Sequence, residues 1–178
     1  MIVAGPTIRE IAAGEPYRRP VHRVHSDFTD VSGPGRVRSL LMEGNTKGRI
    51  RNRLVSGEEA EVIMRRRYTQ YNVWRPMNDP VPREPLGVVD ATTIGPDDTI
   101  ACRTDIGEFL HAVHNPAHRW YYAPDMRPDE VLIFKGYDSA HDGRARFTLH
   151  SAFDDPSTPP DAPQRSNIEA RVFAFFDQ

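Results

Sequence analysis

Turn residues interrupt this sequence at short, regular intervals and leave little room for long helices. Its 178 residues include 16 prolines and 12 glycines. Clusters such as residues 95–98, 115–116 and 141–143 separate runs that are rich in aromatic and β-branched residues. This spacing predicts an antiparallel sandwich or barrel, built as a single domain over residues 1–178. The expected strands are residues 21–28, 68–74, 86–91, 99–103, 109–114, 118–123, 130–137, 145–153 and 168–176.

One segment has a clear helical pattern. Residues 57–66 follow Ser56, a good N-cap, and carry acidic residues in the first turn and arginines in the last. We also expect a short helix at residues 7–13, whereas residues 36–42 fit either a strand or a helix. The prediction is therefore a mainly β domain with one main flanking helix.

Charge and cysteine content exclude several classes of protein. The formal net charge is -2, so no overall field favours a nucleic-acid or acidic-membrane partner. Cys102 is the single cysteine, which excludes an internal disulfide and fits a reducing cytoplasm. No apolar run approaches the ~20 residues that are needed to span a bilayer. We therefore expect a cytoplasmic protein with no nucleic-acid or membrane partner.

A histidine and an aspartate stand two residues apart in the extended segment 24–29. Side chains at positions i and i+2 of a strand share a face, so His25 and Asp27 could bind one ion. The best third ligand is His150, on the polar face of segment 145–153. Two histidines and one carboxylate are the ligand set of non-haem Fe(II) oxygenases. The alternatives are a chance His-x-Asp pair and a hydrogen-bonded or solvent-facing His150.

Two arginines accompany the last expected strand. Arg165 stands at its entrance and Arg171 within it. A guanidinium group beside a metal site can bind the carboxylate of an oxo-acid cosubstrate with two hydrogen bonds. The alternative is that both arginines pair with surface acids such as Glu169 or Asp161.

Seven segments, in order along the chain, carry a resemblance to a known family. They are residues 24–29, 72–76, 86–90, 118–122, 128–139, 145–153 with 155–156, and 165–171. The chain resembles the hydroxylase/desaturase family of fungal and bacterial secondary metabolism, which includes gibberellin desaturase-like and cephamycin methoxylation-component-like proteins. The resemblance implies a double-stranded β-helix, a jelly-roll of the cupin-like type, that uses Fe(II) and 2-oxoglutarate.

The resemblance also implies roles for individual residues. His25, Asp27 and His150 fall where the family's metal ligands are expected, and they would be the catalytic centre. Arg165 resembles the arginine that binds the far carboxylate of 2-oxoglutarate, with Arg171 in reserve.

Further candidates line the expected cosubstrate and substrate sites. The family's Arg-x-Ser motif is replaced here by Arg165-Ser166-Asn167. The amide of Asn167 would therefore stand near the cosubstrate in place of a hydroxyl. For each candidate residue of the substrate pocket, a structural role in packing the framework is an equally good alternative. The pocket candidates are Asn72, Trp74, Arg75, Tyr122 and Lys135.

The expected function is therefore a 2-oxoglutarate-dependent dioxygenase that hydroxylates or desaturates a small molecule. Family members carry a longer region before the His-x-Asp pair, whereas 24 residues precede His25 here. We expect an N-terminally shortened barrel with an uncovered sheet edge, which favours a homodimer. The alternative function is a non-oxidative accessory or binding subunit that retains the fold.

Overall fold

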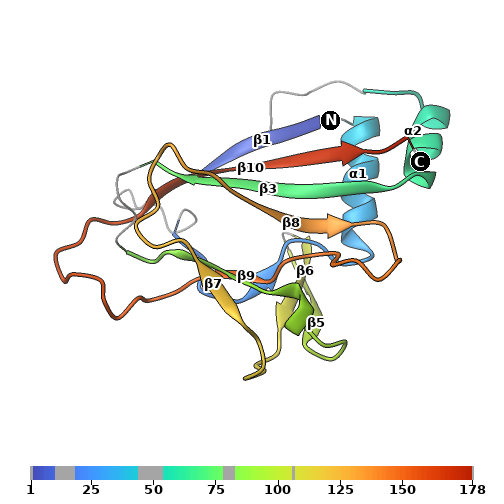
Figure 1. The fold of residues 1–178 in the computed structure, drawn as a ribbon. Coiled ribbons are helices and arrows are strands. Elements are labelled where there is room, and N and C mark those ends of the chain that lie inside the picture. Colours follow the sequence, from blue (N-terminus) through green and yellow to red (C-terminus); the bar gives the residue numbers. More distant parts are fainter. Residues whose placement is uncertain (1, 11–18, 44–53, 78–82, 106, 178) are drawn as a thin grey trace.

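Two antiparallel sheets face each other in the computed structural model, which describes residues 2–10, 19–43, 54–77, 83–105 and 107–177 (Figure 1). Strands far apart in the sequence alternate within each sheet, as the predicted jelly-roll requires. The four-stranded sheet has the order β1 (Ile2–Glu10), β10 (Ser166–Phe175), β3 (Tyr68–Pro76) and β8 (Leu132–Asp138). The six-stranded sheet has the order β5 (Thr99–Thr104), β6 (Gly107–Ala112), β2 (His25–Ser26), β9 (His150–Ala152), β4 (Leu86–Val89) and β7 (Trp120–Tyr122).

Polar residues occupy the inward face of the two central strands of the four-stranded sheet. Along β10 and the residue before it, Arg165, Asn167 and Glu169 are buried at alternate positions. The register pairs Glu169 with Trp74 and Arg171 with Asn72 on β3. Since side chains alternate between the faces of a strand, these residues point between the sheets, where they can build a site.

Most expected strands are confirmed, but two are much shorter than their sequence pattern. Segment 21–28 contributes only β2, and segment 145–153 contributes only β9. Before β9, the side chain of Arg146 bonds to other parts of the chain, with Nε 3.0 Å from the carbonyl oxygen of Asp138. Alternation of side chains alone therefore overestimates the length of the strands that carry the histidines.

The amino-terminal segment differs from the expected short helix. Residues 7–10 belong to β1, which pairs with β10, while residues 11–13 lie outside the described residues. β1 gives the four-stranded sheet an outer strand that the sequence did not predict.

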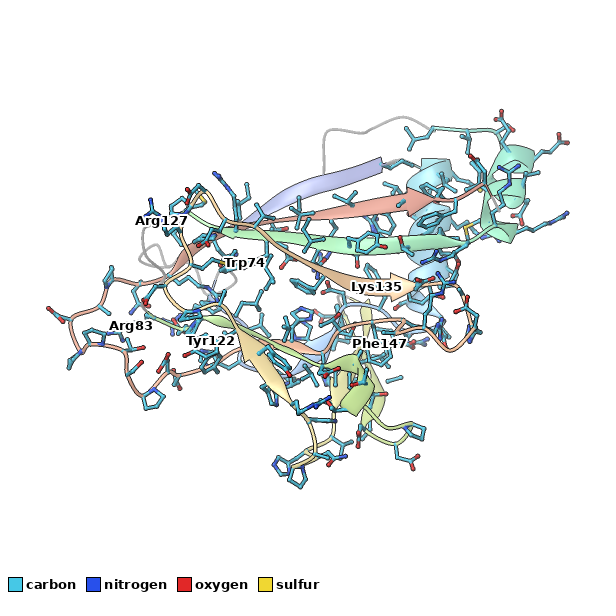
Figure 2. All side chains as sticks on the ribbon, viewed as in Figure 1. Trp74, Arg83, Tyr122, Arg127, Lys135 and Phe147 are labelled. Atoms are coloured by element: carbon cyan, nitrogen blue, oxygen red, sulfur yellow. The ribbon has the colours of Figure 1, made fainter. Side chains whose placement is uncertain are left out.

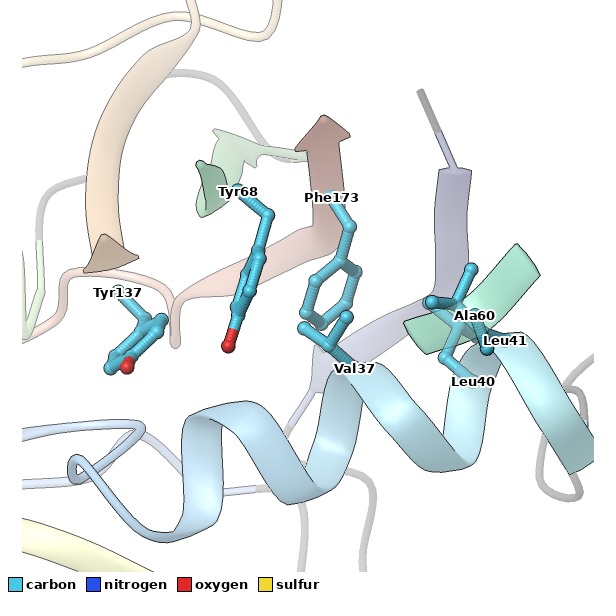
Figure 3. Close-up of a cluster of buried hydrophobic side chains, with 7 residues drawn as sticks. All are labelled: Val37, Leu40, Leu41, Ala60, Tyr68, Tyr137 and Phe173. Carbon is cyan, nitrogen blue, oxygen red and sulfur yellow. The ribbon is translucent and has the colours of Figure 1, made fainter. Parts of the chain in front are cut away.

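Two helices pack at one end of the four-stranded sheet (Figures 1 and 3). The undecided segment 36–42 lies in α1 (Ser32–Glu43), and α2 (Gly57–Arg65) is the predicted helix, with a capping box between Ser56 and Glu59. At the start of α1, a Cβ on Gly33 would meet the Tyr137 ring at 2.9 Å, so glycine allows this close approach. The buried cluster contains Val37, Leu40, Leu41, Ala60, Tyr68, Tyr137 and Phe173.

Phe173 lies between the helices and the sheet and is 1% exposed. We predict that Phe173→Ala lowers the free energy of unfolding by about 3–5 kcal/mol, because it removes a buried ring and leaves a cavity. Urea denaturation measures this change. The control Ile133→Ala, on the same sheet but 62% exposed, should change stability by less than about 0.5 kcal/mol. Equal effects of the two substitutions would contradict this description of the core.

Candidate metal centre

The two candidate histidines lie side by side on neighbouring strands of the six-stranded sheet. β2 and β9 are antiparallel, and their register places His25 opposite His150. The centroids of the two imidazole rings are 4.4 Å apart. Residues directly opposite on antiparallel strands project from the same face. Strand pairing therefore brings together two side chains that are far apart in the sequence.

Each imidazole is oriented by a backbone carbonyl two residues earlier. Nδ1 of His25 lies 2.7 Å from the carbonyl oxygen of Arg23. Nδ1 of His150 lies 3.0 Å from the carbonyl oxygen of Thr148. A carbonyl oxygen only accepts, so in each neutral ring Nδ1 carries the proton and Nε2 carries the lone pair. Both rings thus present Nε2 as the donor atom for a metal.

Asp27 completes the set from just beyond the end of β2, and its side chain is 5% exposed. The donor atoms of His25, Asp27 and His150 all lie within 4.8 Å of one another. Among the described residues, this is the group of His, Cys, Asp or Glu that meets the geometry of a metal site. Two imidazoles and one carboxylate are the donor set of non-haem Fe(II) sites, so these residues fit divalent iron.

The protonation states of His25 and Asp27 already suit the binding of a cation. Burial, and then the neighbouring His150, lowers the pKa of His25, so this ring is neutral at pH 7. Burial alone would raise the pKa of Asp27. The charge of Arg171 and a hydrogen bond from Asn72 overcome that effect and hold the pKa of Asp27 well below its usual range. The carboxylate is therefore ionised throughout the physiological range.

Arg171, on β10, binds the Asp27 carboxylate with two hydrogen bonds. The distances are 2.8 Å from Nη2 to Oδ1 and 3.2 Å from Nε to Oδ2. Nη2 also lies 3.3 Å from Oε1 of Glu169, whose side chain is 10% exposed. Arg171 was the second candidate, after Arg165, for binding the cosubstrate. In the structure it lies against the carboxylate of the metal set.

A small pocket opens beside the three donors. Arg165 lies in its wall and is 3% exposed. Its Nη1 donates to the carbonyl oxygen of Glu84, and its guanidinium carbon lies 5.5 Å from the centroid of the Trp74 ring. The wall is formed by Val21, His25, Asp27, Trp74, Leu86, His150, Ser151, Ala152, Arg165, Glu169 and Arg171.

Comparison with known proteins identifies the family of this chain. Residues 2–175 match a family profile described as "YDMC: Oxidoreductase/YMDC permease-like domain". The chain is 32% identical to the hydroxylase/desaturase asaB of Aspergillus flavus, over 97% of this chain and 90% of that protein. It is 36% identical to the Fe(II)/2-oxoglutarate-dependent dioxygenase nvfI of Aspergillus novofumigatus, over 89% of this chain.

The chain belongs to the hydroxylase/desaturase family of Fe(II)/2-oxoglutarate-dependent oxygenases. A solved structure of the iron and alpha-ketoglutarate-dependent endoperoxidase NvfI superposes with a TM-score of 0.81 at 29% identity, covering 99% of this chain. The fold and family predicted from the sequence are thus confirmed. The chain spans 54% of the length of nvfI, 53% of the aspirochlorine biosynthesis protein N of Aspergillus oryzae and 61% of the solved NvfI chain. No helix in the described ranges is long and apolar enough to cross a membrane.

Of the pocket residues expected from the family, the structure brings Trp74 to the pocket wall, between the two sheets (Figure 2). Asn72 is fully buried behind the site, where its Nδ2 donates to Oδ2 of Asp27 at 2.8 Å. Asn167, expected near the cosubstrate, is also fully buried, and neither of its amide atoms has a hydrogen-bond partner among the described residues. It lies on the same face of β10 as Arg165.

The other three pocket candidates lie outside this pocket wall. Arg75 is exposed, and its Nη1 donates to the carbonyl oxygen of Pro128. Tyr122 is 44% exposed on β7 (Figure 2). Lys135 bonds through Nζ to Oδ2 of Asp138 at 2.8 Å. Alternation along a strand indicates which side chains point inward, but Lys135 and Tyr122 show that it does not indicate which ones reach a site.

Sequence reasoning did not select several site-associated residues, and Glu169 and Gln70 are two of them. Glu169 was considered only as a surface partner of an arginine, yet it is 8% exposed and lines the pocket. Gln70 is 1% exposed and donates to Asn72. Each stands two residues from a residue that was selected, on the same face of its strand, and this i, i+2 relation is the signal that pointed to them.

The contacts of Lys135 lead to a prediction about pH. The buried Asp138 carboxylate also accepts from Arg67, with Nη2 2.8 Å from Oδ2. Burial alone would raise the pKa of Asp138, but these cationic donors lower it from 3.8 to about 2. Since the folded pKa is the lower one, the stabilisation is complete above pH ~5 and is lost as the pH falls through about 2.

We predict that Asp138→Asn lowers the free energy of unfolding by about 2 kcal/mol at neutral pH and by almost nothing at pH ~2. Urea denaturation of both proteins across this range measures the difference. A destabilisation that does not vary with pH would show that the charge of Asp138 is not what stabilises the fold.

Proposed function

We propose that this chain is an Fe(II)- and 2-oxoglutarate-dependent oxygenase that hydroxylates or desaturates a small molecule of secondary metabolism. The observation that carries the proposal is the convergence of His25, Asp27 and His150 within 4.8 Å, beside a pocket that contains a buried arginine. The neutral imidazole of His25 and the ionised carboxylate of Asp27 need no rearrangement of protons to receive a divalent cation.

The three ligands would hold iron on one side and leave its other positions facing the pocket. Bound iron and 2-oxoglutarate would supply the oxidising chemistry that removes hydrogen from an unreactive carbon. The protein's part is orientation. The carbonyl groups of Arg23 and Thr148 fix the imidazoles, and Arg171 fixes the carboxylate of Asp27.

Arg165 is the residue that we assign to the far carboxylate of 2-oxoglutarate. It is buried in the pocket wall and lies beside the Trp74 ring, which helps to hold a planar guanidinium group in place. Arg171 is already engaged by Asp27 and Glu169. The amide of Asn167, buried on the same strand face without a hydrogen-bond partner, is a suitable second group for the cosubstrate.

The apolar part of the pocket wall suits a small organic substrate. Val21, Leu86, Ala152 and Trp74 line the pocket together with the charged groups. Such a wall excludes water from the reacting centre and binds carbon skeletons by burial of apolar surface. The names of the relatives, which refer to a hydroxylase/desaturase and an endoperoxidase, support oxidation of this kind.

We further propose that the protein acts in the cytoplasm and that two copies associate through an exposed sheet edge. The single cysteine supports the first statement. The second is supported by β7, which ends the six-stranded sheet and exposes 45–55% of Trp120 and Tyr121. The mass of the protein in light scattering, compared with that of Tyr121→Lys, tests the association.

The central test is binding of Fe(II) and 2-oxoglutarate without oxygen. We predict that the mixture develops a visible metal-to-ligand charge-transfer band, and that His25→Ala and His150→Ala abolish it, because each loses a donor atom. If the wild-type protein gives no band, the oxygenase function is wrong. The accessory-subunit alternative would then be favoured, since it requires neither ligand.

Titrations should distinguish the roles of Arg165 and Arg171. We predict that Arg165→Ala weakens 2-oxoglutarate binding by at least tenfold and leaves the affinity for the metal almost unchanged. Arg171→Ala should instead weaken the metal, because Asp27 loses the partner that orients it. Calorimetric titration with Mn(II), and then with 2-oxoglutarate, measures both affinities. The reverse pattern would exchange the roles assigned to Arg165 and Arg171.

A further inference from the structure

A chain of hydrogen bonds runs behind the metal centre along the inward face of β3. Gln70 Nε2 donates to Oδ1 of Asn72 at 2.7 Å, and Asn72 Nδ2 donates to Oδ2 of Asp27 at 2.8 Å. Both amides are almost fully buried, with exposed fractions of 1% for Gln70 and 0% for Asn72. The chain therefore connects Asp27 of the metal set to a residue outside the pocket.

Chemistry fixes the direction of this chain. The Asp27 carboxylate is ionised and only accepts, so the amide nitrogen of Asn72, and not its oxygen, must face it. The Asn72 oxygen then points to Gln70, which supplies a donor. Without that donor, the buried oxygen of Asn72 would lack a partner, and the amide would lose one of the two hydrogen bonds that hold its orientation. Gln70 thus sets the orientation of Asn72.

The two carboxylate oxygens of Asp27 accept different numbers of hydrogen bonds. Oδ2 accepts from Asn72 at 2.8 Å and from Nε of Arg171 at 3.2 Å. Oδ1 accepts from Nη2 of Arg171 at 2.8 Å. The two donors at Oδ2 occupy both of its lone pairs, whereas Oδ1 has one more to offer. This asymmetry selects Oδ1 as the atom that Asp27 would present to a metal.

At its Gln70 end, this series of hydrogen bonds lies close to a glycine on β8. A Cβ on Gly136 would lie 1.9 Å from Oε1 of Gln70, so another residue there would displace the glutamine. The carbonyl oxygen of Gly136 accepts from Oγ of Ser26 at 3.2 Å. The backbone of β8 thus supports both Gln70 and the strand that carries His25.

Burial of Gln70 in this position costs free energy of folding. Its Oε1 is buried without a hydrogen-bond partner among the described residues. An unsatisfied buried oxygen opposes folding, and an apolar side chain of similar size would avoid that cost. Such a side chain would, however, leave Oδ1 of Asn72 without its donor, so what the glutamine supplies at this position is the hydrogen bond to Asn72.

We propose that Gln70 and Asn72 are positioning residues that orient Asp27 as a metal ligand, with Gln70 acting through Asn72. The proposal rests on the proposed function, because it assigns these residues to the same metal site. It predicts that metal affinity and ligand geometry depend on two side chains that touch neither metal nor substrate.

Binding of Co(II), an oxygen-tolerant substitute for Fe(II) with a visible spectrum that reports its ligand geometry, tests the proposal. We predict that Asn72→Ala weakens Co(II) binding 10- to 100-fold and changes the spectrum of the bound metal. Gln70→Leu should weaken binding less, and the double variant no more than Asn72→Ala alone. Thermal unfolding of the metal-free proteins shows that each variant folds.

The matched control is Thr69→Val, on the same strand and equally buried, whose hydroxyl has no hydrogen-bond partner among the described residues. It should bind Co(II) as the wild type does and with the same spectrum. If the wild type itself binds no Co(II), the proposed function fails. If the wild type binds but Asn72→Ala and Gln70→Leu match it in affinity and spectrum, the metal site stands and the positioning role is wrong. Additive losses in the double variant would overturn the claim that Gln70 acts through Asn72.

Discussion

The charge pair between Asp27 and Arg171 joins the two sheets, and the rest of the site depends on it. Asp27 follows β2 in one sheet, whereas Arg171 belongs to β10 in the other, and two hydrogen bonds link them. Asp27 is buried, with 5% of its side chain exposed, so loss of Arg171 would leave a buried carboxylate without its charged partner. The carboxylate of the metal set is therefore held in place before any metal arrives.

The charges around the pocket balance before and after loading. Two buried carboxylates, Asp27 and Glu169, face two arginines, Arg165 and Arg171. A divalent cation and the dianion of 2-oxoglutarate add no net charge when they bind together, so the pair suits a site of low polarity.

Local patterns in the sequence predicted the candidate metal ligands and much of the fold. The i, i+2 spacing of His25 and Asp27, and the polar position of His150, pointed to residues that the structure brings together. The position of α1 was not decidable, because Gly33 and Gly35 in its first turns obscure the helical pattern and its packing on Tyr137 is a tertiary contact. Asn72 was a candidate for the pocket wall because segment 72–76 resembles the family, with framework packing as the equal alternative. The hydrogen bond from Asn72 to Asp27 depends on how the two sheets are stacked, which no local pattern records.

The most direct test is the position of the iron itself. Crystals grown without oxygen in the presence of Fe(II) and 2-oxoglutarate can be measured at the iron absorption edge, where anomalous scattering locates the metal. We predict one peak bounded by Nε2 of His25, Nε2 of His150 and Oδ1 of Asp27, with the far carboxylate of 2-oxoglutarate against Arg165. Absence of iron between these three atoms, in crystals where the protein is intact and both ligands are in excess, would contradict the account.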